Sequence, residues 1–171
     1  RFQEGGLPYV LTATWIEYVG DEIQALFPEI TLDRPAALPQ LLVGRSSTEL
    51  HSGEAEWMTA DESGLLLSGN AHFRGENAEG EKLDLYATSM HVQRTEEGDE
   101  RSQGVQELVA WDGFELIVGD DLLGRGEILQ VGYQMLRLEG RPARFDVHGF
   151  VWESDNIEYD VPNVLVTTDQ G

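Results

Sequence analysis

The sequence predicts an all-β protein whose strands pair antiparallel. Segments rich in β-branched and aromatic residues recur at roughly ten-residue intervals, and almost none of the chain has a helical period. Apolar and polar residues alternate within these segments: Leu83 and Leu85 fall on one face of a strand, and Asp84 and Tyr86 on the other. A sheet with one apolar face has to cover that face, so we expect it to fold around an apolar interior.

A repeated unit supports this fold class. The stretch 126–146, GEILQVGYQMLRLEGRPARFD, contains strand-like segments separated by a Gly140-Arg141-Pro142 step that predicts a turn. Similar units occupy 57–73 and 157–166, and residues 16–18 (Ile-Glu-Tyr) repeat the start of the last one. Four imperfect copies of a hairpin-sized unit predict a repetitive β architecture.

The amino-terminal part is predicted to be β-rich, with one ambiguous segment. Residues 7–18 form a strand candidate, and 30–32 form another. Residues 21–27 are the best short helical candidate, but they are equally compatible with a strand because Pro28 ends the pattern. Residues 34–39, RPAALP, contain two prolines and are predicted to form a connector.

From residue 50 onward the pattern is steadily β. We expect one domain, residues 1–171, with lead-in strands over 1–40 and repeated strand units over 41–171. Turns or loops are expected at 61–64, 75–80 and 95–104. The strand candidates are 50–57, 65–73, 83–93, 105–111, 114–118, 128–138, 143–152 and 156–167.

Charge and composition exclude several classes of partner. The chain has 32 acidic against 11 basic residues, a formal net charge of -21, and 40% hydrophobic residues. Nucleic acid and anionic membrane surfaces would repel such a protein, because binding phosphates requires clustered cations. Cysteine is absent, which excludes disulfides and thiolate metal sites, and no apolar run approaches membrane-spanning length.

Catalytic and cofactor motifs are weak. Carboxylates are so numerous that any acid pair can be drawn, and the glycine-rich 119–126 lacks the Gly-Lys-Ser/Thr ending of a phosphate-binding loop. The four tryptophans are widely spaced and predict core or rim positions. We therefore expect no catalytic residue, metal or cofactor. The histidines match no metal-ligand spacing; they are His51, His72, His91 and His148.

The apolar strand faces remain as the candidate site. Two readings stay open from the residues alone: a closed, packed core, or a groove for an apolar ligand. The predicted lining residues are Leu67, Phe73, Leu83, Leu85, Leu116, Val118, Leu136, Leu138, Phe145, Val164 and Val166.

Three stretches carry a resemblance to a known family. They are LLLSGNAHF at 65–73, VGYQMLRLEGRPARF at 131–145 and SDNIEYDVPNVLV at 154–166, with a looser match over 9–32. Their order of aromatic, strand, glycine and strand resembles the OstA-like lipopolysaccharide-transport periplasmic family, of LptA and LptC type.

The resemblance implies an open antiparallel β-jelly roll of the periplasm and cell envelope, acting without catalysis in outer-membrane biogenesis. Its apolar interior would shield the acyl chains of lipopolysaccharide or a related glycolipid, and its edge strands would pair with other β-jelly-roll proteins. The alternative is a structural or interaction module of stacked β-repeats with a closed core. A third hypothesis is a small β-barrel enzyme using a His–carboxylate pair. The residues most expected to contact acyl chains are Leu67, Phe73, Leu83, Leu85, Leu138 and Phe145.

Overall fold

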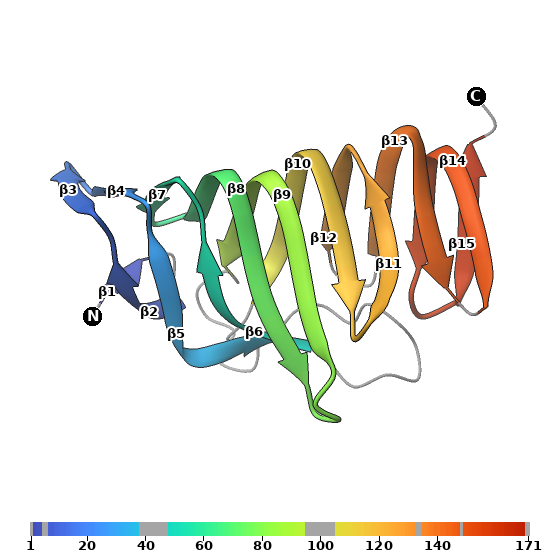
Figure 1. Cartoon of the computed structure of the whole chain (residues 1–171), viewed down its shortest axis with the longest axis horizontal. Coiled ribbons are helices and arrows are strands. Elements are labelled where there is room, and N and C mark those ends of the chain that lie inside the picture. The colour runs from blue at the N-terminus through green and yellow to red at the C-terminus, as the bar shows by residue number, and fades with distance from the viewer. Residues whose placement is uncertain are drawn as a thin grey trace.

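The computed structural model describes residues 2–4, 7–37, 48–94, 105–132, 135–147 and 149–169, and within them every regular element is a strand of one antiparallel sheet. The predicted all-β, antiparallel β-jelly-roll class is therefore confirmed (Figure 1). The strands are β1 (Phe2–Glu4), β2 (Leu7–Thr12), β3 (Trp15–Val19), β4 (Glu22–Leu26), β5 (Glu29–Ala37), β6 (Thr48–Glu54), β7 (Trp57–Asp61), β8 (Gly64–Asn77), β9 (Lys82–Arg94), β10 (Val105–Val118), β11 (Asp121–Gly126), β12 (Ile128–Gly132), β13 (Met135–Val147), β14 (Phe150–Asp160) and β15 (Leu165–Asp169).

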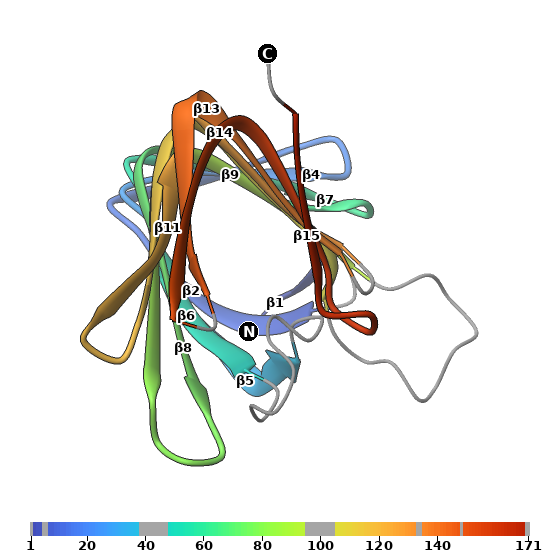
Figure 2. The same ribbon diagram turned by 90° about the vertical axis from the view of Figure 1, so that its right-hand side faces the viewer.

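The sheet is folded over along a line that we call the crease. Strands β8, β9, β10, β13 and β14 cross it, and the shorter strands lie on one side or the other. In the first layer β7 pairs with residues 64–68 of β8, and β12 pairs with 108–110 of β10. In the second layer β6 pairs with 72–77 of β8, and β11 pairs with 114–118 of β10. Seen along its length, the sheet wraps around an interior (Figure 2).

Bulges and left-handed residues form the crease. Registers shift between Ser68 and Ala71 in β8, between Trp111 and Phe114 in β10, and between Glu139 and Ala143 in β13. Asn70 and Asp112, with positive φ angles of 47° and 61°, sit inside two of these shifts. Extra residues in one strand bend it and increase its twist, so the bulges let long strands turn the corner without ending.

The predicted turn at Gly140-Arg141-Pro142 is wrong. This step lies within the continuous strand β13, as Ser68-Gly69-Asn70 lies within β8, where 65–73 was expected to be one strand. Each strand keeps one neighbour on both sides of the step, β14 for β13 and β9 for β8, so the chain bends there and does not reverse. The repeated unit is thus a strand that crosses the crease, where a hairpin was expected.

Other boundaries also differ from the prediction. The ambiguous segment at 21–27 contains strand β4, and the expected connector at 34–39 is strand as far as Ala37. Residues 7–18 divide into β2 and β3, whereas 105–111 and 114–118 join into β10. The glycine-rich 119–126 contains β11, since its Leu122 and Gly124 pair with β10. The expected loop at 95–104 and His148 lie outside the described residues.

Candidate functional site

Nine of the eleven predicted lining residues lie in the interior and are at least nine-tenths buried. They are Leu67, Phe73, Leu83, Leu85, Leu116, Val118, Leu136, Leu138 and Phe145. Val166 is partly buried and packs against this cluster. Val164 is the exception: it lies in the turn between β14 and β15 with a φ of 51° and is 46% exposed, so its expected inward position is wrong.

Further apolar residues that the sequence analysis did not select complete the interior. Phe145 packs against Tyr159, with ring centroids 5.4 Å apart, and both side chains are fully buried. The two-residue period along β14 and β4 could have identified Ile157, Tyr159 and Ile23 by the reasoning used for the other strands. The cluster extends from Tyr9 in β2 to Val161 after β14, so apolar side chains run from one end of the sheet to the other.

The interior is filled by the protein's own side chains. Leu67, Leu138 and Phe145 have no exposed surface, and Phe73 is 1% exposed. Among the buried lining residues of the second layer in the carboxy-terminal half, Val118 is 9% exposed, Leu123 7%, and Val147 and Phe114 4% each. Val118 and Val147 are the last residues of β10 and β13, on the side opposite the crease.

Both ends of the sheet present unpaired edges. In the described residues β3 pairs only with β4, and β15 pairs only with β14. Exposed apolar side chains gather at these ends, because β3 is exposed along its whole length and both strands at the other end carry large apolar groups. These residues are Trp15, Ile16, Tyr18 and Val19 at one end and Phe150, Val151, Val164 and Leu165 at the other.

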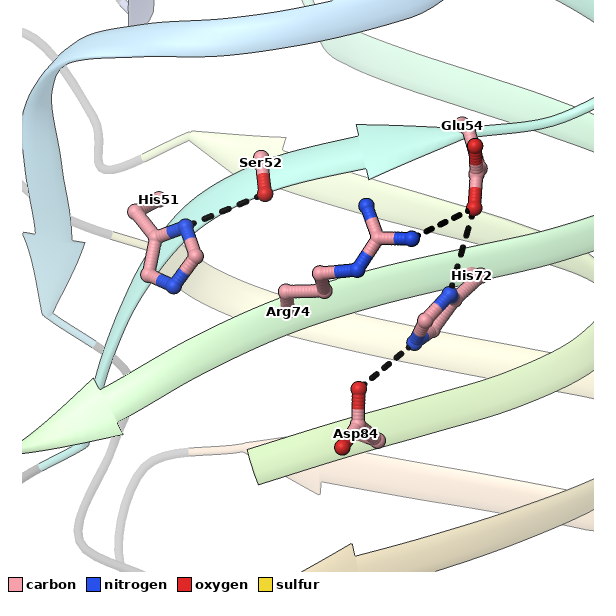
Figure 3. Close-up of polar contacts among 6 residues, drawn as sticks. All are labelled: His51, Ser52, Glu54, His72, Arg74 and Asp84. Carbon is pink, nitrogen blue, oxygen red and sulfur yellow. Dashed lines mark hydrogen bonds and ion pairs between the residues drawn. The ribbon is translucent and has the colours of Figure 1, made fainter. Parts of the chain in front are cut away.

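A polar cluster lies on the outer face of the second layer (Figure 3). The imidazole of His72 is 2.7 Å from an Asp84 carboxylate oxygen and 3.4 Å from one of Glu54, and Arg74 donates to Glu54 at 2.7 Å. His72 is 8% exposed, and the ring of Tyr86 stacks on it at 4.1 Å. A His–carboxylate pair therefore exists, but it lies outside the apolar interior where the enzyme hypothesis requires it.

The remaining predicted candidates form no metal site among the described residues. His51 contacts the hydroxyl of Ser52 at 3.0 Å, and no group of three His, Asp or Glu side chains there has ligand geometry. Of the tryptophans, Trp15 is 42% exposed and stacks on Trp57, while Trp152 packs against the core. The described part of the chain also contains no helix that could cross a membrane.

Comparisons with known proteins give little sequence similarity. No family model matches the chain, and no curated protein matches it. A solved structure of similar strand arrangement is LptH of Pseudomonas aeruginosa, the LptA-homologous periplasmic component of its lipopolysaccharide transport device. The two share 11% sequence identity and a TM-score of 0.49, over 99% of this chain and 87% of LptH.

Proposed function

We propose that this protein shields the acyl chains of lipopolysaccharide or a related glycolipid, without catalysis, during transport across the periplasm to the outer membrane. The observation that carries the proposal is the apolar interior, which both layers line and which runs from Tyr9 to Val161. Acyl chains gain about 0.8 kcal/mol for each CH₂ group removed from water. A carrier for them needs an apolar surface that continues along its length, and this interior has that property.

The fold suggests how a hydrocarbon chain would be admitted. The described backbone hydrogen bonds join neighbouring segments along the crease, for example from Phe27 N–H to the Glu56 carbonyl and from Gly113 N–H to the Glu127 carbonyl. A small separation of the strand ends opposite the crease would expose Val118, Leu123 and Val147 first, since they are already the more accessible of the lining residues there. We therefore place the mouth of the groove at these three side chains.

The same proposal assigns the unpaired ends to contacts with other β-jelly-roll proteins. An edge strand offers free backbone donors and acceptors, and exposed apolar patches commonly mark contact surfaces. The two ends differ in sequence, so a contact between the opposite ends of two copies would be heterologous and would extend head to tail.

One observation favours the alternative of an interaction module with a closed core. Leu67, Leu138 and Phe145 are completely buried, so the interior resembles an ordinary packed core as it stands. The edges and their apolar residues would serve such a module equally well. The two functions differ in one measurable property, which is uptake of hydrocarbon.

Displacement of a fluorescent fatty acid by lipid A tests uptake. Val118→Trp fills the proposed mouth, and Ile117→Trp adds the same ring to the outward-facing neighbour on β10. We expect saturable binding that Val118→Trp weakens about tenfold, corresponding to roughly 1.4 kcal/mol, and that Ile117→Trp leaves unchanged. Circular dichroism checks that both variants keep the fold. Absence of saturable binding, or equal weakening by both variants, would favour the closed module.

Light scattering as a function of protein concentration tests association through the ends. Ile16 in β3 and Ile128 in β12 are both 37% exposed, but only Ile16 lies on an end strand. We expect Ile16→Lys to reduce association and Ile128→Lys to leave it unchanged, because a lysine on an edge strand opposes pairing with another edge. The opposite order would place the contact elsewhere.

A further inference from the structure

A pocket lies at the crease, and three buried residues of the apolar cluster, Ala71, Ala87 and Phe114, form part of its lining. This pocket has a volume of about 550 Å³, within the range of small-molecule sites. Its polar lining comes from four neighbouring strands, β8 to β11, and includes residues of the bulges in β8 and β10. These residues are Asn70, Tyr86, Thr88, Asp112, Glu115 and Arg125. Tyr86, Thr88 and Glu115 are exposed, so the pocket opens on the outer face of the sheet.

The crease creates the pocket. Asn70 and Asp112 both have positive φ angles, which the bulges in β8 and β10 impose on them. Thr88 lies on β9 between these two bulges, and its hydroxyl donates to the Asp112 carbonyl at 2.7 Å. Asn and Asp adopt left-handed backbone more readily than other residues with a side chain, so these two residues suit the bulges and place their side chains beside the pocket.

Tyr86 forms a rigid flat wall of this pocket. One face of its ring is covered by the imidazole of His72 at 4.1 Å with an interplanar angle of 16°. His72 is itself held between Asp84 and Glu54, and Glu54 is held by Arg74 (Figure 3). The buried imidazole of His72 therefore restrains the orientation of Tyr86, which is 43% exposed and leaves its other face to the pocket.

Charged groups stand beside the free face of Tyr86. Glu115 is the cross-strand neighbour of Tyr86 on one side and of Arg125 on the other. In the part of the chain that the structure describes, the side chains of Glu115, Asp112 and Arg125 form no hydrogen bond or ion pair with one another or with other residues. Two carboxylates and one guanidinium thus offer both acceptors and donors within one pocket.

We propose that this pocket binds a saccharide ring. A sugar ring has an apolar face that can lie on Tyr86 and a rim of hydroxyl groups that both donate and accept hydrogen bonds. Asp112 and Glu115 would accept from hydroxyls, and Arg125 would donate to them, together with the one amide N–H of Asn70 that Glu56 does not accept. The two carboxylates oppose a strongly anionic ligand, and the charged lining opposes a purely apolar one. The binding does not depend on uptake of lipid by the interior.

Chemical-shift titration of the ¹⁵N-labelled protein tests this proposal. The probes are methyl α-D-glucopyranoside, maltose and N,N′-diacetylchitobiose, none of which has an acyl chain of a lipid. D-Glucitol is the matched control ligand because it has the hydroxyl groups of glucose without a ring face. N-Acetylarginine amide and inorganic phosphate test for recognition of a cation or an anion.

We expect saturable shifts at residues 70, 86, 112 and 125 with at least one of the three saccharides and no saturation with glucitol. Tyr86→Ala should weaken binding about tenfold, whereas Tyr86→Phe keeps the stacking face and most of the affinity. Phe150→Ala, which removes an exposed ring far along the chain from the pocket, should have no effect. Arg125→Gln changes an exposed side chain and should weaken binding without affecting the fold.

Three results would overturn the proposal. One is the absence of saturable shifts with all three saccharides. Another is unchanged affinity in both Tyr86→Ala and Arg125→Gln. The third is tighter binding of N-acetylarginine amide or phosphate than of every saccharide, which would assign the pocket to a charged ligand.

Discussion

Replacing Phe145 with alanine should cost about 4 kcal/mol of the free energy of unfolding. Phe145 is fully buried in β13, and its ring packs against Tyr159 at 5.4 Å. Phenylalanine-to-alanine changes in cores cost about 3–5 kcal/mol, and paired rings add roughly 0.5–1.5 kcal/mol beyond their buried area. We place Phe145 in the upper part of the range because strands on both sides of β13 restrain collapse into the cavity.

Urea unfolding followed by circular dichroism measures this cost. Domains are generally stable by about 5–15 kcal/mol, so the variant should remain folded and its transition midpoint should fall. Phe150→Ala is the control: Phe150 pairs with Val147 in the same sheet but is 66% exposed, and its replacement should change stability by less than about 0.5 kcal/mol. A Phe145→Ala cost below about 1 kcal/mol would mean that the interior is solvated, and it would refute the description of a packed interior.

Three further predictions follow from local geometry. Gly64→Ala should cost about 2 kcal/mol or more in urea unfolding, because an added Cβ would collide with the Val92 carbonyl oxygen at a φ of +153°. Hydrogen bonds from Ser63 hold the pKa of Asp61 below its ordinary value of 3.8. The resulting stability is present above that value and is lost as pH falls through the lowered pKa, so the stability difference between wild type and Asp61→Asn should shrink on acidification below pH 3.8. Arg137→Ala should lower the free energy of unfolding by at most about 1 kcal/mol at any salt concentration. The Arg137 side chain is 41% exposed, and an ion pair that solvent reaches, such as the one with Glu139, contributes little to stability.

The fold class could be predicted because it depends on the two-residue alternation of apolar and polar side chains along each strand. The alternation of Leu83 and Leu85 with Asp84 and Tyr86 identified the inward face of β9 correctly, since every second side chain of a strand points the same way. The crease could not be predicted in this way. Gly140-Arg141-Pro142 has the composition of a turn, and only the continued pairing of β13 with β14 on both sides makes it a bulge.

The candidate site was likewise only partly predictable from the sequence. Nine lining residues follow from alternation, but Val164 does not, because the turn before β15 shifts the start of that strand to Leu165. The pocket at the crease had no sequence signal. Tyr86 and Glu115 are 29 positions apart in the chain, and the register of β9 with β10 alone brings them together. Whether the interior is open or packed depends on the volumes of the side chains that fill it, and the alternation of apolar and polar residues does not specify these volumes.

Photo-crosslinking to lipid A tests the account of the interior most directly. p-Benzoylphenylalanine would replace either Leu116, whose side chain points into the interior, or Ile117, which lies on the outward face of the same strand. Uptake of acyl chains predicts a crosslinked product from position 116 that unlabelled lipid A competes away, and little product from position 117. Equal products from the two positions, or a product from position 117 alone, would contradict the shielding of acyl chains inside the folded sheet.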